Sequence, residues 1–225
     1  MKIAVLGTGG VGKAFAPKLA ELGHDVCLGT RDVQKTLAVN EKNSVAEFIT
    51  QHPGLKLKNF AEAAQWAELI INVSKGSASL DVIKSCGEKN LAGKIIVDIS
   101  NPLDFSRGMP PILIPELCNT TSLGEEIQKL VPEAKVVKTL NTMWNGLMIN
   151  PSLINGGNHI NYLCGNDEAA KKTVSKLLQD LGWKKENLLD IGDISGARAT
   201  EATLPIWLRV YGARQSGAFN FQIVS

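Results

Sequence analysis

The stretch Lys2-Ile-Ala-Val-Leu-Gly-Thr-Gly-Gly-Val-Gly-Lys13, near the start of this 225-residue chain, decides its fold. The apolar run from Ile3 to Leu6 predicts a short buried strand, and a helical pattern comes after the glycines. Gly7 permits a tight turn, Gly9 lets a pyrophosphate approach the backbone, and Gly12 lets helix and sheet pack closely. Glycines at this spacing between a strand and a helix predict a dinucleotide-binding turn. The alternative is a glycine-rich turn that binds no ligand.

Composition and charge exclude several classes of protein. The net charge of +2 is small and the lysines are scattered, so no nucleic-acid-binding surface is expected. No apolar run approaches the ~20 residues that span a bilayer. Lys2 leads directly into a strand, unlike a signal peptide. We therefore expect a cytoplasmic protein that binds neither nucleic acid nor membrane.

The cysteines and histidines form no recognisable site. Cys27, Cys86, Cys118 and Cys164 lie far apart without a C-x-x-C pair, which predicts free thiols in a reducing compartment and no metal site. The three histidines are isolated, and each is expected in a loop or at the surface. No catalytic residue is predicted among them.

Short apolar runs alternate with helical patterns along the chain, which predicts an α/β fold with a doubly wound, mostly parallel sheet of the Rossmann type. Residues 1–150 are expected to form the dinucleotide-binding domain. Residues 151–225 are expected to form a small C-terminal α/β extension that packs on it and forms the acceptor site. The strands expected in the two parts cover residues 3–6, 25–28, 55–58, 68–74, 94–100 and 134–140, then 159–165, 188–191 and 219–224.

The tetrapeptide Gly29-Thr30-Arg31-Asp32 follows the second expected strand. In this fold an acid at that strand end selects NAD, whereas small polar residues with an arginine accept the 2′-phosphate of NADP. Thr30 and Arg31 fit NADP, and Lys35, one helical turn later, adds a second cation. Asp32 has the usual spacing of the NAD acid, but we place it one step past the strand end. NADP is therefore expected over NAD; the alternative is that these cations are solvated loop charges.

Three further segments are expected above the carboxyl ends of the strands, where ligands bind in this fold. Val73-Ser74-Lys75-Gly76 ends one buried strand, and Lys75 is either a ligand contact or a surface lysine. The loop from Phe105 to Pro115 is long, apolar and rich in proline, which predicts a packed cover. Trp144 is either a platform for a planar ring or a core residue.

The expected site lacks general acid–base residues, because no histidine and no Ser-His-Asp or Cys-His arrangement falls in its loops. A hydride passed from NADPH to a flavin-like ring needs no protein base, since the acceptor ring supplies the chemistry and the protein supplies position. Two alternatives stay open. One is a reductase of a small carbonyl or imine with Lys75 or Thr142 as proton donor, and the other is a non-catalytic NADPH-binding redox sensor.

Four motifs together resemble the NADP-dependent coenzyme F420 (deazaflavin) reductases, and the resemblance covers nearly the whole chain. They are Gly7-Thr-Gly-Gly-Val-Gly12, Gly29-Thr-Arg-Asp32, Asp98-Ile-Ser-Asn-Pro102 and Val136-Val-Lys-Thr-Leu-Asn-Thr142. The same family includes the NADPH-binding domain of membrane ferric reductases, which uses an ordinary flavin. The resemblance implies an oxidoreductase that transfers hydride between NADP(H) and either F420 or a flavin such as FMN or FAD.

The resemblance also implies which residues bind the cofactors. The pyrophosphate would lie on Thr8 to Val11, and the deazaflavin would stack near Trp144 and the helix from Leu204 to Trp207. The cofactor-binding residues expected in this way are Gly7, Thr8, Gly9, Gly10, Val11, Gly12, Thr30, Arg31, Lys35, Val73, Ser74, Gly76, Asn101, Leu140, Asn141 and Trp144. A small-molecule hydride acceptor is the expected partner, and apolar residues near the C-terminus are expected to supply a homodimer interface.

Overall fold

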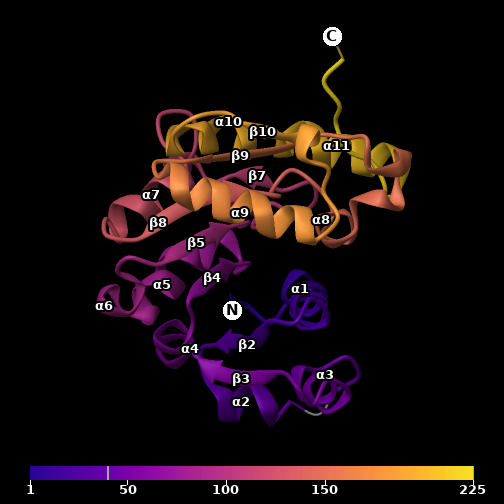
Figure 1. The fold of residues 1–225 in the computed structure, drawn as a ribbon. Coiled ribbons are helices and arrows are strands. Elements are labelled where there is room, and N and C mark those ends of the chain that lie inside the picture. The colour runs from indigo at the N-terminus through magenta and orange to yellow at the C-terminus, as the bar shows by residue number, and fades with distance from the viewer. Residues whose placement is uncertain (40, 225) are drawn as a thin grey trace.

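The structure, a computed structural model that describes residues 1–39 and 41–224, is built on one eight-stranded sheet (Figure 1). The strand order is β10-β9-β8-β5-β4-β1-β2-β3, and every neighbouring pair is parallel except β8 with β9. The predicted doubly wound, mostly parallel sheet is therefore confirmed. The strands are β1 (Lys2–Leu6), β2 (Asp25–Thr30), β3 (Lys56–Asn59), β4 (Leu69–Asn72), β5 (Ile95–Asp98), β8 (Lys135–Thr139), β9 (Asn161–Gly165) and β10 (Leu188–Asp190).

The direction in which the sheet grows reverses beside β1. The chain runs from β1 outward to β2 and β3, then returns to the other side of β1 to form β4. Ligands of such sheets bind at this switch point, outside the carboxyl ends of the strands. The connecting helices are α1 (Gly10–Glu21), α2 (Val33–Leu37), α3 (Val45–Gln51), α4 (Phe60–Trp66), α5 (Gly76–Cys86), α6 (Glu88–Leu91), α7 (Leu123–Leu130), α8 (Asn145–Ile149), α9 (Glu168–Asp180), α10 (Ala197–Ala202) and α11 (Leu204–Arg214).

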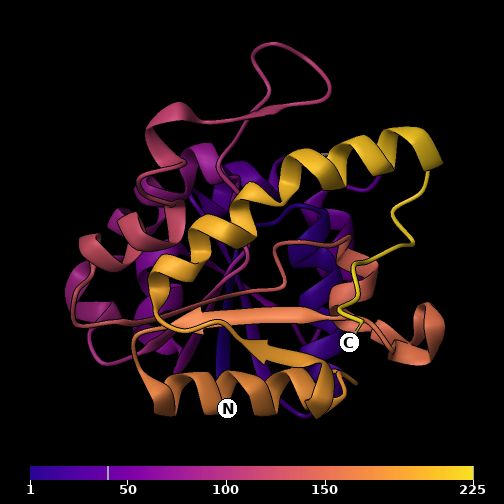
Figure 2. The ribbon, with the colours of Figure 1, turned by 90° about the horizontal axis from the view of Figure 1, so that it is seen from above.

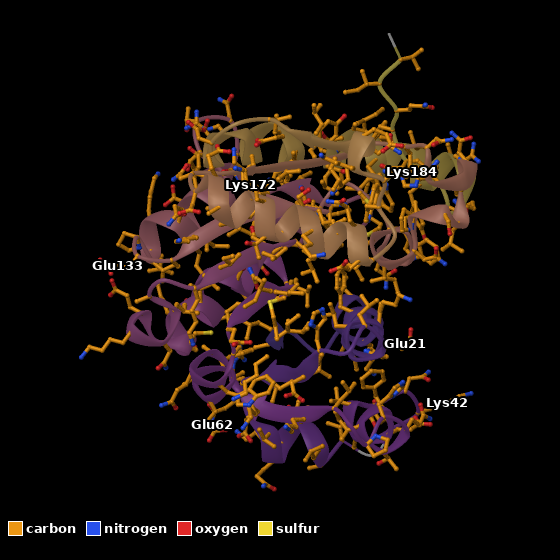
Figure 3. All side chains as sticks on the ribbon, in the orientation of Figure 1. Glu21, Lys42, Glu62, Glu133, Lys172 and Lys184 are labelled. Carbon is orange, nitrogen blue, oxygen red and sulfur yellow. The ribbon has the colours of Figure 1, made fainter. Side chains whose placement is uncertain are left out.

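Both faces of the sheet are covered, which is why its central strands are apolar throughout. Ile3 and Val5 of β1 belong to one apolar cluster, with residues of α1, α8 and α9. Ala4 and Leu6 belong to a second cluster, with residues of α4, α5 and α7. Charged side chains of these helices and their connections, such as Glu62, Glu133 and Lys172, point outward into solvent (Figure 3).

The C-terminal part of the chain adds to the same sheet. β9 pairs with β8, and β10 pairs with β9. The strand predicted for residues 219–224 is wrong: these residues are in no strand, and the Ile160 N–H, just before β9, donates to the Phe221 carbonyl at 3.0 Å. One such contact does not make a ladder. The division of the chain at residue 150 stays a prediction.

One further prediction is wrong. The loop from Phe105 to Pro115 is not packed as a cover: it follows β6 (Leu103–Asp104) and contains β7 (Ile112–Leu113), the two strands of a hairpin, and Met109 at its tip is 68% exposed. Figure 2 shows this hairpin standing out from the body of the protein. His159 lies in a loop, one of the two places expected for it, but it is buried, and its Nε2 lies 2.8 Å from the Pro151 carbonyl oxygen. No neighbouring residue in the sequence indicates this burial.

A buried lysine joins two strands of the sheet to α10. The Lys138 ammonium on β8 lies 2.8 Å from Asp98 Oδ2 on β5, 2.7 Å from Glu201 Oε1 on α10 and 2.5 Å from the Ser100 carbonyl. All three protons of the ammonium therefore have acceptors. Burial alone would lower the pKa of Lys138, but the two carboxylates outweigh it and raise that pKa, so the lysine stays charged.

The same carboxylates extend the network to both sides. Asp98 Oδ1 accepts hydrogen bonds from Asn72 Nδ2 at 2.8 Å and from Ser100 Oγ at 2.6 Å. Glu201 accepts the N–H groups of Leu123 and Gly124 at the start of α7, at 2.9 and 3.1 Å. The ends of β4, β5 and β8 and two helices are thus held by one set of buried charges.

Replacing Lys138 by methionine should lower the free energy of unfolding by about 3–5 kcal/mol, because it leaves two buried carboxylates without their partner. Urea denaturation measures this loss. Lys135→Met is the matched control on the same strand: its ion pair with Asp167, at 3.2 Å, is exposed and should be worth less than about 1 kcal/mol. Equal small losses in both variants would contradict the network's role.

Candidate functional site

The glycine-rich turn brings β1 and α1 into backbone contact at the switch point. Gly7 has a φ of 129°, and a Cβ there would lie 3.0 Å from the Val73 carbonyl oxygen. A Cβ on Gly12 would lie 2.1 Å from the Gly7 oxygen. Packing within the protein therefore dictates both glycines. Gly9 differs, because a Cβ there would meet no protein atom within 4 Å; its open surface is what close approach of a ligand requires.

Two helices begin at this edge of the sheet without a side-chain cap. The N-cap residues are Gly9 for α1 and Lys75 for α5, and neither cap makes a side-chain hydrogen bond. A Cβ on Gly76 would lie 1.8 Å from the Asn101 carbonyl oxygen, so α5 starts in backbone contact with the end of β5. The first N–H groups and positive dipole ends of both helices favour an anion at this edge.

The first cavity at this edge, which we call the arginine cavity, lies at the end of β2 and has a volume of about 440 Å³. The predicted residues Thr30, Arg31 and Lys35 all line it. Thr30 is buried and its hydroxyl bonds that of Thr36 at 2.8 Å, whereas the Lys35 side chain is 87% exposed. The full lining is Lys13, Thr30, Arg31, Asp32, Lys35, Thr36, Val39, Asn43, Ser44 and Val45.

Asp32 lies past the end of β2, as the sequence predicted. It is the N-cap of α2: its Oδ1 accepts the N–H of Lys35 at 3.0 Å, and its Oδ2 lies 3.8 Å from the Lys35 ammonium. One carboxylate oxygen is thus committed to capping the helix backbone, which gives Asp32 a structural role.

Lys13 is a third cation of the arginine cavity that the sequence reading missed. Its ammonium donates to the carbonyl oxygens of Asn43 and Ser44, the latter at 3.3 Å, and lies 5.6 Å from the centre of the Phe48 ring. Its place directly after Gly12, in the first turn of α1, was the available signal.

The second cavity, which we call the strand-end cavity, lies above the ends of β4 and β5 and has a volume of about 370 Å³. It brings together six predicted residues, Val11, Val73, Ser74, Gly76, Asn101 and Trp144. The remaining lining residues are Lys75, Ile99, Ser100, Leu103, Phe105, Met143, Asn145 and Met148. Met143 and Met148, which sequence reasoning missed, make its inner wall apolar.

Two predicted residues lie beneath this cavity and do not line it. Leu140 and Asn141 are buried. The Asn141 amide donates to Asn101 Oδ1 at 2.9 Å, and Asn101 Nδ2 donates to the Asn141 carbonyl at 2.8 Å. Asn141 thereby orients Asn101, which does line the cavity.

The helix from Leu204 to Trp207 does not line the cavity either, and its expected place beside the acceptor stays a prediction. Trp207 stacks on Tyr211 and Phe219, with ring centres 5.4 and 5.2 Å apart. These aromatic contacts hold the C-terminal segment against α11.

The strand-end cavity offers little acid–base chemistry. Lys75 is the one titratable side chain among the described residues that line it, and its ammonium lies 5.6 Å from the centre of the Phe105 ring. Thr142 does not line the cavity, and its buried hydroxyl makes no hydrogen bond within the described part of the chain. The walls can therefore hold and orient an apolar ring, and they hold no carboxylate, imidazole or thiol beside it.

Two absences hold for residues 1–39 and 41–224. No three histidine, cysteine, aspartate or glutamate side chains gather there in a way that would hold a metal ion. Every helix in the same ranges is too short or too polar to cross a lipid bilayer.

Comparison with known proteins gives concordant results. The family profile described as NADP oxidoreductase, coenzyme F420-dependent, matches residues 2–102. A crystal structure from Arthrobacter sp. FB24, provisionally assigned as an F420-dependent NADP reductase, is 50% identical, covers 100% of both chains and superposes with a TM-score of 0.95.

Two curated proteins align with more than nine-tenths of this chain. The F420-dependent NADP reductase of Methanothermobacter marburgensis is 27% identical over 93% of this chain and 92% of its own length. Metalloreductase STEAP3 of Rattus norvegicus is 29% identical over 92% of this chain, but the chain spans only 38% of that protein. With half of its residues shared across the whole length of the Arthrobacter protein, the chain belongs to the family of coenzyme F420-dependent NADP oxidoreductases and is an NADP-dependent oxidoreductase.

Proposed function

We propose that this protein transfers hydride between NADPH and a flat ring acceptor, either coenzyme F420 or a flavin such as FMN or FAD. The observation that carries the proposal is the strand-end cavity, an apolar space at the switch point whose lining includes one titratable side chain, Lys75. Hydride transfer to such a ring requires the protein to hold the two rings in position in an apolar space, and it requires no side-chain base. The coenzyme F420-dependent NADP reductase of M. marburgensis, similar along nearly its whole length, supports the F420 assignment.

The residues present fit NADP(H). Gly9 offers an open backbone surface for a pyrophosphate, and the arginine cavity offers three cations for a further phosphate. We assign the pyrophosphate to residues 8–11 and the 2′-phosphate to Thr30, Arg31 and Lys35. We also assign Lys13 to the 2′-phosphate, because it lines the same cavity. Val73, Ser74, Gly76 and Asn101 are assigned to the nicotinamide side of the cofactor.

The reduced nicotinamide supplies the hydride when it is bound, and the chain's own residues set the geometry. Asn101 is fixed by its paired hydrogen bonds with Asn141, so its amide does not need to reorganise when the cofactor binds. Met143, Met148 and Phe105 give the space beside the ring apolar walls. Holding two reacting carbons about 3–3.5 Å apart in such a space provides much of the acceleration.

Replacing Arg31 by alanine should weaken NADPH binding about 10- to 100-fold, because it removes a charge-assisted contact to the 2′-phosphate. NADH binding should change by less than about twofold, since NADH carries no such phosphate. Calorimetric titration of both nucleotides measures this. Arg214→Ala, an exposed arginine of α11, is the control. Equal affinity of the wild-type protein for NADH and NADPH would contradict the NADP assignment.

Replacing Lys75 by methionine should lower the rate of NADPH oxidation with F420 or FMN by less than about threefold, because hydride transfer to a ring needs no side-chain proton donor. Thr142→Val should be equally mild. Loss of a true proton donor costs about 10²–10⁴-fold, and a loss of that size in either variant would favour a carbonyl or imine substrate instead. The nicotinamide absorbance band gives the rate, and Lys84→Met, an exposed lysine of α5, is the control.

The homodimer and the cytoplasmic location stay predictions. Ile206 and Tyr211 of α11 are large apolar side chains that are exposed in the isolated chain, which supports an interface on this helix.

A further inference from the structure

The indole of Trp144 occupies a space that two glycines leave open. Trp144 is the N-cap residue of α8, is 42% exposed and lines the strand-end cavity. A large aromatic side chain on a surface is free to sample several rotamers unless its neighbours restrict it. The neighbours of Trp144 restrict it from two parts of the chain.

The outer ring of the indole lies on Gly146. A Cβ on Gly146 would lie 2.3 Å from Cζ3 and 2.4 Å from Cη2 of Trp144. Gly146 sits inside α8 and is not among the glycines with positive φ, so no backbone demand explains its choice. Glycine inside a helix costs stability relative to alanine. The indole is the neighbour that accounts for it.

The base of the indole lies on Gly217. A Cβ on Gly217 would lie 2.8 Å from Cγ and 2.9 Å from Cβ of Trp144. Gly217 also lacks a positive φ. Two glycines that are far apart in the sequence are therefore both required by one side chain.

The segment that carries Gly217 is anchored on both sides. Before it, Gln215 ends α11 in a left-handed conformation, with a φ of 51°. After it, Phe219 stacks on Trp207, and Asn220 Nδ2 donates to the Ile160 carbonyl at 2.8 Å. Figure 2 shows this segment turning back from the end of α11 toward β9. The backbone at Gly217 is thus held in place and can support the indole.

We propose that Gly146 is a positioning residue that, with Gly217 behind it, fixes the Trp144 indole as the acceptor-facing wall of the strand-end cavity and so selects a flat ring as the hydride acceptor. This inference rests on the proposed function. An indole fixed in one rotamer leaves room beside the nicotinamide for a planar ring on which it can stack. A methyl group at position 146 displaces the outer ring of the indole from this rotamer and so changes the wall that the acceptor meets.

A double-mutant cycle tests the inference. The four proteins are the wild type, Gly146→Ala, Trp144→Leu and the double variant, each saturated with NADP+ and titrated calorimetrically with oxidised F420 or FMN. Gly146→Ala should weaken acceptor binding about tenfold when Trp144 is present and leave the Kd of NADPH within about twofold. In the Trp144→Leu background the same substitution should have no effect on acceptor binding, because the clashing ring atoms are gone.

Thermal unfolding of the same proteins gives a readout that needs no acceptor. Gly146→Ala should lower Tm when Trp144 is present and raise it in the Trp144→Leu background, since alanine is the better helix former once the clash is removed. Gly212→Ala in α11 is the control, because a Cβ there meets no atom within 4 Å and acceptor binding should not change.

The outcomes separate this inference from the proposed function. Equal losses of acceptor affinity in both backgrounds, or a parallel loss of NADPH affinity, would overturn the positioning role of Gly146. Gly146→Ala could weaken acceptor binding only when Trp144 is present, as expected, while none of the four proteins oxidises NADPH. That result would contradict the proposed function and support the inference. Failure of every ring acceptor to bind the wild type would overturn both.

Discussion

The protein depends on backbone-to-backbone contacts that only glycine allows. A Cβ on Gly12 would overlap the Gly7 carbonyl, and one on Gly76 would overlap the Asn101 carbonyl. These contacts bring the first turns of α1 and α5 directly onto the carboxyl ends of β1 and β5. Two positive helix ends then lie at the edge of the sheet where ligands of this fold bind. Any larger residue at either position would push a helix away and open the site.

The two cavities at this edge of the sheet differ in their chemistry. The arginine cavity carries the cations Lys13, Arg31 and Lys35, which suit a phosphate, whereas the strand-end cavity has mainly apolar walls, which suit a ring. The Lys138 network ends on the hydroxyl and carbonyl of Ser100, which lines the strand-end cavity. Buried charges thereby give the strand ends a fixed geometry, which a site without acid–base groups needs most, since position is its main contribution to rate.

The sequence predicted what local patterns determine. The class of sheet, the glycine turn and the cation at Arg31 all follow from short motifs whose physical role does not depend on distant partners. The buried ion-pair network of Lys138 could not be predicted, because its partners Asp98 and Glu201 are far from it in the sequence. The role of Gly146 could not be predicted either, because it depends on the position of the Trp144 indole in the structure. Residues 219–224 alternate like a strand, but alternation does not show which partner a segment meets: Phe221 accepts a backbone hydrogen bond from Ile160, before β9 begins.

If the protein holds two rings face to face, hydride passes directly between their carbons. NADPH deuterated at the transferred C4 position, mixed with the enzyme and oxidised F420 in ordinary water, shows whether it does. Carbon-bound deuterium on the reduced deazaflavin does not exchange with solvent, so mass spectrometry can follow it. The deuterium should be recovered on the deazaflavin ring. Its appearance in water, or reduced deazaflavin that carries only solvent hydrogen, would contradict direct transfer.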